Sequence, residues 1–470
     1  MSENTSLTPL QLRVVWTSWI VGGLARLLYI EVVHPATHFM FSDMWGYAER
    51  GRHFFDGSTK TIADTIYPPG ASIFFGLLFN LDPAWNLSSI AQWLLSLGVM
   101  GLSWSLARRL YGNTVAVVTL ALLALYLPLF HYAALFLAEN PFTFLMLLTL
   151  RLFICAIDAT TRQTALAWAT AAGLSAGVAA AFKTTIFGPL AVLGLIYAAY
   201  AVKHRKPFLV PVSAAVVAGV ALLLVPMSLR CTELAEGHFC LAATNGPMNI
   251  LQGHYGHKFM FNWHDPARNY FFHFGSPTAP LHGYTDSVDL QFGAYDSAAN
   301  LKLVRAYIAE HPWDALLQSF SNALDLFDGT TLWPQATLLR HDAGAWFQRV
   351  FWWLVLLPAA ARIVLRWRPT MDLTRDSLRE WLLLAPVLGL MALAFIAEGE
   401  VRYRVPFDSL LMILAASTYV DLARAIRKRW QGERGVARTT ISAAESAESA
   451  NSAARAYSSD STEPMPQQSR

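Results

Sequence analysis

The chain has 470 residues, of which 54% are hydrophobic and 14% charged, and its mean hydropathy is +0.36. An average soluble domain carries about 25% charged residues, so the composition excludes an ordinary soluble protein and indicates a polytopic membrane protein. The formal net charge is only +3, and the basic residues form short clusters between apolar runs. Nucleic acid is therefore excluded as a partner.

Apolar runs long enough to cross a bilayer recur along the chain. A spanning helix needs about 20 predominantly apolar residues. The runs are 14–32, 87–107, 114–130, 141–157, 164–182, 186–202, 208–227, 347–365, 380–397 and 405–423. They predict an all-α polytopic membrane protein with about ten transmembrane helices. The first residues lack the basic region and cleavage site of a signal peptide, so the first helix is expected to remain as a signal anchor.

The short loops with Lys and Arg fall on one side of these spans. By the positive-inside rule that side, with residues 1–13 and the other terminus, is the cytoplasm. The opposite, outer side then carries two long segments, a first loop at 33–86 and a large loop at 228–346. The tail at 425–470 is rich in Ala, Ser and Glu without a core-forming pattern, and it is expected to be disordered.

The outer loops contain their own predicted structure. Segment 70–81 is apolar but too short to span, which favours a juxtamembrane or re-entrant helix. Residues 288–327 show helical periodicity around a break at Pro312. Cys231 and Cys240 lie close together in the large loop. They would form a disulfide in an oxidising compartment, and two unpaired thiols are the alternative.

Acidic residues stand where the outer loops meet the membrane. Asp43 follows the first span, with Glu49 six residues on. A carboxylate at this interface can act as a general base or as an electrostatic partner to an incoming hydroxyl, whereas the simpler alternative is a helix N-cap. Glu139 precedes a proline at a helix start, where the alternative is a carboxylate that stabilises the helix N-terminus.

Three of the cations on the outer side stand in short turns at the ends of spans, where the positive-inside rule predicts few. They are Lys183, Arg402 and Arg404. Charge at the edge of the hydrocarbon is costly unless it is paired, snorkelled or used, and such a cluster suits an anion such as a lipid phosphate. The alternatives are a snorkelling lysine at a helix end and arginine ion pairs with Glu398 or Glu400.

The sequence offers little support for a metal site or for nucleotide chemistry. His254 and His257 are the only close histidine pair in a suggestive context, and no metal-binding pattern such as HExxH accompanies them, so they are interpreted as loop residues. A divalent metal held partly by Asp43 stays open. The sequence has no Walker motif, nucleophile elbow or dinucleotide fingerprint, which excludes the usual cytosolic nucleotide chemistry.

Six segments in order resemble motifs of the GT-C superfamily, integral membrane glycosyltransferases that use polyprenyl-phosphate-linked sugars. The superfamily includes protein mannosyltransferases and aminoarabinose transferases. The segments are SDMWGYAERG with Asp43, Tyr67-Pro68-Pro69-Gly70, LAENPFTFLMLL with Glu139, GLSAGVAAAFKTTIFGPLAVL with Lys183, TNGPMNILQGHYG with Asn245, and EGEVRYRVPFDSLLMILAA with Arg402 and Tyr403. The family loop often carries two adjacent acids, and protein mannosyltransferases tend to have His where Tyr67 stands.

The resemblance implies a GT-C-like domain over 14–424, with juxtamembrane helices in the first outer loop. It implies transfer of a sugar from an undecaprenyl-phosphate or related donor to a lipid, glycan or protein acceptor. The reaction would be an inverting single displacement at the periplasmic face of a bacterial inner membrane. The rival is a transporter or lipid-handling membrane protein without transferase activity, for which internal repeats and charges at the bilayer midplane are expected.

The resemblance also implies roles for individual residues. Asp43, alone or with Glu49, would accept the proton of the acceptor hydroxyl. The departing polyprenyl phosphate would be held by cations, and other side chains would shape the cavity. The expected phosphate-binding residues are Lys183, Arg402 and Arg404, and the expected cavity-lining residues are Tyr67, Pro68, Glu139, Asn245 and Tyr403.

Overall fold

The structure is a computed structural model. It describes residues 6–40, 43–56, 60–205, 208–254, 259–265, 269–275, 284–290, 292–293, 295–327, 349–365 and 377–431. The chain divides into two units, Met1–Ser417 and Thr418–Arg470. The described residues of the second unit are helical to Gln431, so the predicted tail begins later than 425, and the rest of that tail lies outside the described residues.

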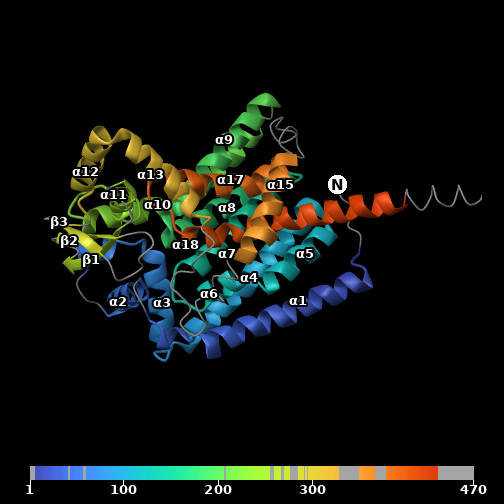
Figure 1. Ribbon diagram of the computed structural model, residues 1–470, viewed down its shortest axis with the longest axis horizontal. Helices are drawn as coiled ribbons and strands as arrows, with labels where there is room; N and C mark the ends of the chain where they lie inside the picture. Colours follow the sequence, from blue (N-terminus) through green and yellow to red (C-terminus); the bar gives the residue numbers. More distant parts are fainter. Residues whose placement is uncertain are drawn as a thin grey trace, which may run out of the picture. The chain divides into compact units, whose positions relative to one another are not determined.

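The first half of the chain is built from helices (Figure 1). The α-helices are α1 (Pro9–Leu28), α2 (Asp43–Phe55), α3 (Pro69–Leu81), α4 (Asn86–Tyr111), α5 (Asn113–Ala124), α6 (Leu127–Ala133), α7 (Glu139–Asp158), α8 (Arg162–Phe182), α9 (Phe187–Lys203) and α10 (Leu209–Leu234). Short turns of helix lie between them at η1 (Tyr29–Val33), η2 (Ala36–His38), η3 (Ile62–Thr65) and η4 (Thr184–Ile186). The predicted short helix at 70–81 is thus present as α3.

The second half adds a small sheet to the helices. Its helical elements are α11 (Gly246–His254), α12 (Ser297–Glu310), α13 (Pro312–Asp325), η5 (Trp352–Leu356), α15 (Leu357–Leu365), α17 (Ser377–Ile396), α18 (Val401–Arg404) and η6 (Val405–Phe407). The strands β1 (Phe259–Asp265), β2 (Asn269–Gly275) and β3 (Tyr284–Leu290) pair antiparallel in the order β1-β2-β3. Pro312 separates α12 from α13, as the periodicity predicted, whereas the sheet was not predicted.

Seven helices among the described residues are long and apolar enough to cross a membrane, and the bent pair α5 and α6 would make an eighth. They are α4, α7, α8, α9 with η4, α10, α17 and the helix Val401–Gln431. The predicted class of helical membrane proteins is confirmed, although the small sheet departs from the all-α prediction, and the predicted count of about ten spans is higher than the count in the described residues. The predicted span 14–32 does not pass the same test, and α1 carries the buried Arg26, whose guanidinium donates 2.7 Å to Leu123 O. The predicted span 347–365 begins outside the described residues, so the test does not cover all of it.

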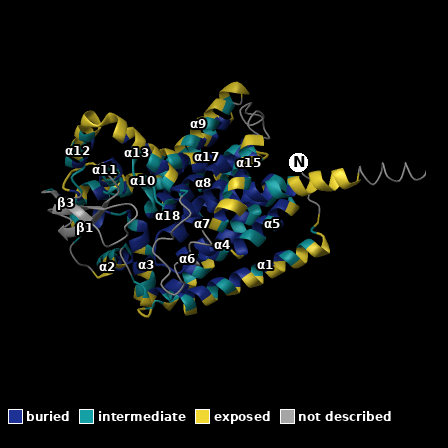
Figure 2. Cartoon of the chain, viewed as in Figure 1, coloured by how far each residue is buried: buried dark blue, intermediate teal, exposed yellow. Residues whose placement is uncertain are grey.

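The described spans differ in how much of their surface the protein covers. Buried residues make up 56% of the apolar windows of α7 and α8, compared with 22% for α9 and 17% for α10 (Figure 2). Helix α8 packs against α7 on one side and α10 on another. Because α9 and α10 leave most of their apolar side chains uncovered, they present the larger surface to the lipid.

Glycines hold the first outer loop close to the membrane helices. At Gly51 of α2, a Cβ would lie 2.6 Å from Ser72 O of α3, so only glycine allows this helix pair to approach so closely. A Cβ on Gly70 would lie 2.6 Å from Ala181 O, near the end of α8. The glycine of the Tyr67-Pro68-Pro69-Gly70 motif therefore sets the start of α3 against the helix that ends next to Lys183.

The large outer loop is tied to the end of α10. Cys231 and Cys240 form a disulfide with a Cα–Cα distance of 5.5 Å. Ser228 of the same helix donates 2.7 Å to Cys240 O. The backbone N–H of Thr244 then donates 2.8 Å to Thr65 O, so this part of the loop reaches the first outer loop.

Candidate active site at the outer ends of the helices

Asp43 is the first residue of α2, and its two carboxylate oxygens face other elements. Tyr67 donates its hydroxyl to Oδ1 at 2.9 Å, and Arg402 Nη1 lies 3.1 Å from Oδ2. About 15% of the Asp43 side chain remains exposed. Since both oxygens are used in this way, the contacts do not support the N-cap alternative.

Arg402 lies at the centre of a chain of polar contacts. Its Nε lies 2.8 Å from Glu400 Oε2, a charge contact without hydrogen-bond alignment, and its Nη2 donates 3.1 Å to Tyr403 Oη. Tyr403 in turn donates 2.6 Å to Glu398 Oε1. The predicted ion pair with the neighbouring acids is therefore present, and Arg402 additionally connects these acids to Asp43.

Lys183 follows the last residue of α8, and it pairs with the acid that opens α7. Its Nζ lies 2.6 Å from Glu139 Oε1, and only 4% of the Glu139 side chain is exposed. The same ammonium lies 4.9 Å from the ring centroid of Tyr403, and the guanidinium of Arg402 lies 5.0 Å from that centroid. Tyr403 thus brings the two cations together, and the snorkelling alternative for Lys183 does not describe this contact.

Tyr67 orients Asp43 as a neutral phenol. Burial, with the charge of Asp43, raises the pKa of Tyr67 well above its usual range, so the hydroxyl keeps its proton and donates it. Arg50 lies over the Tyr67 ring at 4.6 Å, and within the described part of the chain its buried Nε and Nη2 have no hydrogen-bond partner.

Sequence reasoning did not select Arg50. The signal was its position seven residues after Asp43, which places both on one face of a helix.

Two predicted site residues lie away from this cluster. Glu49 is exposed on α2 and points about 120° away from Asp43 around the helix axis. Arg404 is fully buried and pairs with Asp408, with Nε 2.9 Å from Oδ1. Its Nη1 donates 3.0 Å to Leu326 O. The prediction that Arg404 binds phosphate is therefore wrong, because its donors are used inside the protein.

The two remaining residues that were predicted to line the cavity are Pro68 and Asn245, and both lie at helix starts. Pro68 precedes the first residue of α3, so it sets where that helix begins. Asn245 accepts from the backbone N–H of Asn249 through its carbonyl at 2.9 Å, at the start of α11. The next residues, Gly246 and Pro247, line a cavity, but Asn245 itself does not.

Within the described residues, the cluster holds four acids and three cations, of which Lys183 and Arg402 pair with acids. Burial and the nearby charge of Glu400 raise the pKa of Glu398 to about 7. This acid can therefore be neutral near physiological pH, which lowers the negative charge that an incoming anion would meet. The acids are Asp43, Glu139, Glu398 and Glu400, and the cations are Lys183, Arg402 and Arg50.

The donor set does not favour a metal ion. Over the described ranges, no group of three or more His, Cys, Asp or Glu side chains is arranged to hold one. The oxygens of Asp43 face a phenol and a guanidinium, both of which are hydrogen-bond donors rather than co-ligands. We therefore derive no catalytic step through a metal.

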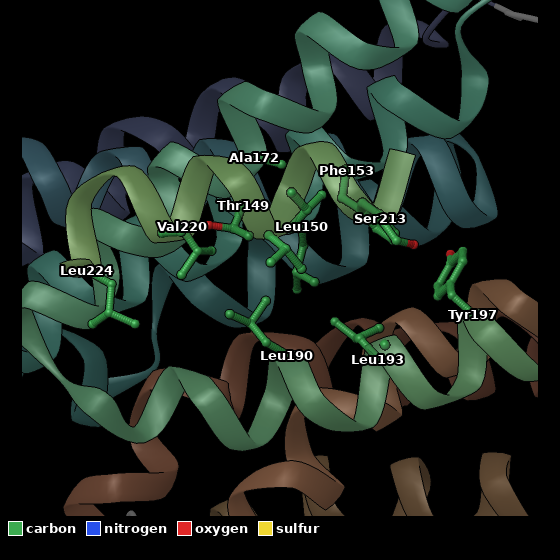
Figure 3. A pocket seen from close by; sticks show the side chains of 14 residues that line it. Thr149, Leu150, Phe153, Ala172, Leu190, Leu193, Tyr197, Ser213, Val220 and Leu224 are labelled. Carbon is green, nitrogen blue, oxygen red and sulfur yellow. The ribbon is translucent and has the colours of Figure 1, made fainter. Parts of the chain in front are cut away.

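Two cavities adjoin the membrane helices. One, of about 290 Å³, lies next to the charged cluster and is lined by residues of η4, α11 and α17 with Glu398 and Tyr403. The other, of about 300 Å³, lies among the spanning helices α7, α8, α9 and α10 (Figure 3). In Figure 3, Leu190 and Leu193 of α9 face Leu150 and Val220 across this second space, which is almost entirely apolar.

Comparison with known proteins bears on the fold. The family model of dolichyl-phosphate-mannose-protein mannosyltransferases matches residues 67–229. None of the curated proteins matches the chain in sequence. The apo oligosaccharyltransferase of Archaeoglobus fulgidus shares its fold over 89% of this chain, with a TM-score of 0.51 and 13% identity. The match covers 52% of that protein, so this chain spans about half the length of the archaeal enzyme.

A second solved structure has a lower TM-score but a higher sequence identity. ArnT from Cupriavidus metallidurans in the apo state matches 87% of this chain and 77% of its own, with 17% identity and a TM-score of 0.38. The family match begins at Tyr67 and includes the predicted Glu139 and Lys183 motifs. The resemblance to GT-C membrane glycosyltransferases that the motifs predicted is thus confirmed, by the family match over 67–229 and by the shared fold.

Proposed function

We propose that this chain is an integral membrane glycosyltransferase. It moves a sugar from a polyprenyl-phosphate-linked donor to an acceptor at the periplasmic face of an inner membrane. The observation that carries the proposal is the carboxylate of Asp43, oriented by Tyr67 and Arg402 and still partly exposed. The family match and the shared fold support the same reaction class.

The proposed reaction is a single displacement. The acceptor hydroxyl attacks the anomeric carbon while its proton passes to Asp43. The bond between that carbon and the phosphate oxygen breaks, and the electron pair leaves with polyprenyl phosphate. Attack from the opposite side inverts the anomeric configuration, and the transition state has oxocarbenium character.

Lys183 and Arg402, next to the cavity that Glu398 and Tyr403 line, stabilise the leaving group. The Lys183 ammonium has three N–H donors, and one of them donates to Glu139. Arg402 contacts the same Tyr403 ring as Lys183. The negative charge of the phosphate grows as the bond breaks, and preorganised cations meet that charge best.

The isoprenoid chain needs an apolar path from this point into the membrane. Helix α9 begins four residues after Lys183, and its Leu190 and Leu193 line the apolar cavity of Figure 3. At 1.5 Å per residue, these side chains lie about 10–15 Å along the helix from Lys183. This supports entry of the lipid chain alongside α9.

The disulfide supports the proposed side of the membrane. Cys231 and Cys240 are linked at the outer end of α10, and disulfides persist in oxidising compartments. The loop that carries them contacts Thr65 in the first outer loop, which also holds Asp43 and Tyr67. This supports a periplasmic site.

The test uses the purified protein in nanodiscs, a polyprenyl-phosphate-linked sugar and a membrane glycolipid extract as the acceptor source. Release of polyprenyl phosphate is measured. Asp43→Asn is expected to lower the rate roughly 100- to 10,000-fold, the usual contribution of a general base. The matched control on the same helix is Glu49→Gln, which is expected to keep the wild-type rate.

Two outcomes would overturn parts of this proposal. Full activity in Asp43→Asn would remove Asp43 from the role of base. Unchanged donor affinity in Lys183→Ala would show that the phosphate binds elsewhere. Substrate-dependent flux in vesicles without any sugar transfer would instead support a transporter.

A further inference from the structure

The cavity beside the charged cluster is lined by both polar and apolar side chains. Its volume is about 290 Å³, at the small end of the range for ligand pockets. Its polar lining residues are Thr184, Thr185, Asn249, Glu398 and Tyr403, and α17 and α11 supply most of the apolar ones. Two of these polar residues directly follow a cation in the sequence, since Lys183 precedes Thr184 and Arg402 precedes Tyr403.

Several of these polar groups are available to a ligand. Within the part of the chain that the structure describes, the side chains of Thr184, Thr185 and Asn249 make no hydrogen bond. Glu398 accepts from Tyr403 through Oε1, which leaves its second oxygen for another donor. Hydroxyls and an amide both donate and accept, as sugar hydroxyls also do.

The elements that line the cavity are held in place by contacts with one another. Asn322 of α13 donates from Nδ2 to Gly253 O of α11 at 2.9 Å and to Ala397 O after α17 at 2.7 Å. On the other side, a Cβ on Gly389 of α17 would lie 2.4 Å from Gly188 O of α9, so these two helices are in close contact. The walls are therefore fixed before a ligand enters, which lowers the cost of binding.

We propose that this cavity binds the sugar ring of the donor, and that it selects an uncharged monosaccharide over a uronic acid. This inference rests on the proposed function. The sugar is one bond away from the phosphate, so its pocket must adjoin the phosphate-binding cations, as this cavity does. Among the described residues of its lining, Glu398 is the only one with an ionisable carboxyl, and none is Lys or Arg. A sugar carboxylate would meet a like charge there, while the adjoining Lys183 and Arg402 are engaged with the phosphate.

The experiment compares three kinds of lipid in equilibrium binding to the full-length protein in nanodiscs. These are sugar-free polyprenyl phosphate, polyprenyl-phosphate-linked neutral hexoses of gluco, manno and galacto configuration, and the matching uronic acids. For wild-type protein, at least one hexose is expected to bind roughly tenfold more tightly than its uronic acid at pH 8, where Glu398 is ionised.

Variants then separate the sugar from the phosphate. Asn249→Ala with Thr185→Val is expected to weaken binding of that hexose lipid roughly tenfold and to leave the sugar-free lipid unchanged. Glu398→Gln is expected to reduce the preference over the uronic acid below about threefold. Lys183→Ala is expected to weaken all three kinds of lipid, and Glu49→Gln none of them.

The outcomes distinguish this inference from the proposed function. If none of the lipids binds to the folded wild-type protein, the proposed function fails and the sugar pocket fails with it. If the lipids bind but the Asn249 and Thr185 variant weakens the sugar-free lipid as much as the hexose lipid, only the sugar pocket fails. Equal wild-type affinity for each hexose and its uronic acid would overturn the charge selection. Thermal unfolding of each variant confirms that it is folded.

Discussion

Glu398 is an acid that the fold makes harder to ionise. Burial and the neighbouring Glu400 raise its pKa from 4.5 to about 7, against the opposing influence of Arg402. Below pH 4.5 the folded and unfolded states both hold the proton. Between pH 4.5 and 7 the unfolded state releases it first, so stability falls as the pH rises, and the loss is complete above pH 7.

The corresponding prediction concerns Glu398→Gln, which cannot ionise. Relative to wild type, this variant should gain stability as the pH rises from 4.5 to 7, by at most about 3 kcal/mol, since one pKa unit corresponds to about 1.4 kcal/mol. Its amide oxygen can still accept from Tyr403. Denaturant unfolding at a series of pH values measures the difference, and a gap that does not change with pH would contradict the raised pKa.

The sequence identified some residues of the charged cluster but could not predict their contacts. The sequence singled out Lys183, Glu139, Arg402 and Asp43 because unpaired charge at the membrane edge is costly, but it did not predict that Lys183 pairs with Glu139 or Arg402 with Asp43. The same argument cannot tell Arg402 from Arg404. Two residues apart on a helix, they point about 200° away from each other, so one reaches Asp43 and the other reaches Asp408.

A spacing in the sequence could have identified the second pair. Arg404 and Asp408 are four residues apart, which places them on one face of a helix.

At the scale of elements, the pair of Arg404 and Asp408 joins the last spanning helix to its neighbours. Tyr126, between α5 and α6, donates its hydroxyl to Asp408, and Arg404 stacks 4.1 Å over the ring of Phe351 and donates to Leu326 O. Both charged side chains are fully buried. Removing one partner leaves a buried charge without compensation.

Arg404→Met is therefore expected to destabilise the protein by about 3–5 kcal/mol. The double variant Arg404→Met with Asp408→Leu should lose much less, because it buries no lone charge. Arg424→Met is the control, since Arg424 pairs with Asp421 on an exposed surface and should cost under about 1 kcal/mol. Unfolding in mixed detergent micelles measures all three, and equal losses in the single and double variants would contradict the explanation.

The elements themselves were predictable where apolar periodicity defines them. The short α3 and the pair α12 and α13 follow from length and from the Pro312 break. The strands β1, β2 and β3 were not predicted, because helical periodicity carries no information on strands. Residues 269–275 read NYFFHFG, an aromatic run that ends in glycine, and such runs favour a strand.

At the scale of the whole chain, the helices within Met1–Ser417 have two kinds of end. At one end Arg109 pairs with Asp158 at 2.7 Å, and Arg362 and Tyr111 both contact Glu380. At the other end Lys183 pairs with Glu139, and the disulfide links the last turns of α10 to Cys240. The alternation of basic loops predicted this division, because each span must reverse the direction of the chain.

The sequence could not predict which acids and bases meet. The contact between Asp43 and Arg402 joins residues 359 positions apart. Such a contact depends on how α2 and α18, far apart in the sequence, are brought together in the fold, and periodicity alone carries no information on that.

The orientation of the chain in the membrane is the last prediction. Asp314 on α13 and Gln163 on α8 are both exposed and belong to opposite ends of the helices. With Cys155→Ser as background, Asp314→Cys should react with a membrane-impermeant maleimide in intact spheroplasts, whereas Gln163→Cys should react only after permeabilisation. The physical reason is that the basic ends, which include Arg162, stay in the cytoplasm. The reverse labelling pattern would place Asp43, Lys183 and Arg402 on the cytoplasmic side, where the disulfide of Cys231 and Cys240 would be reduced.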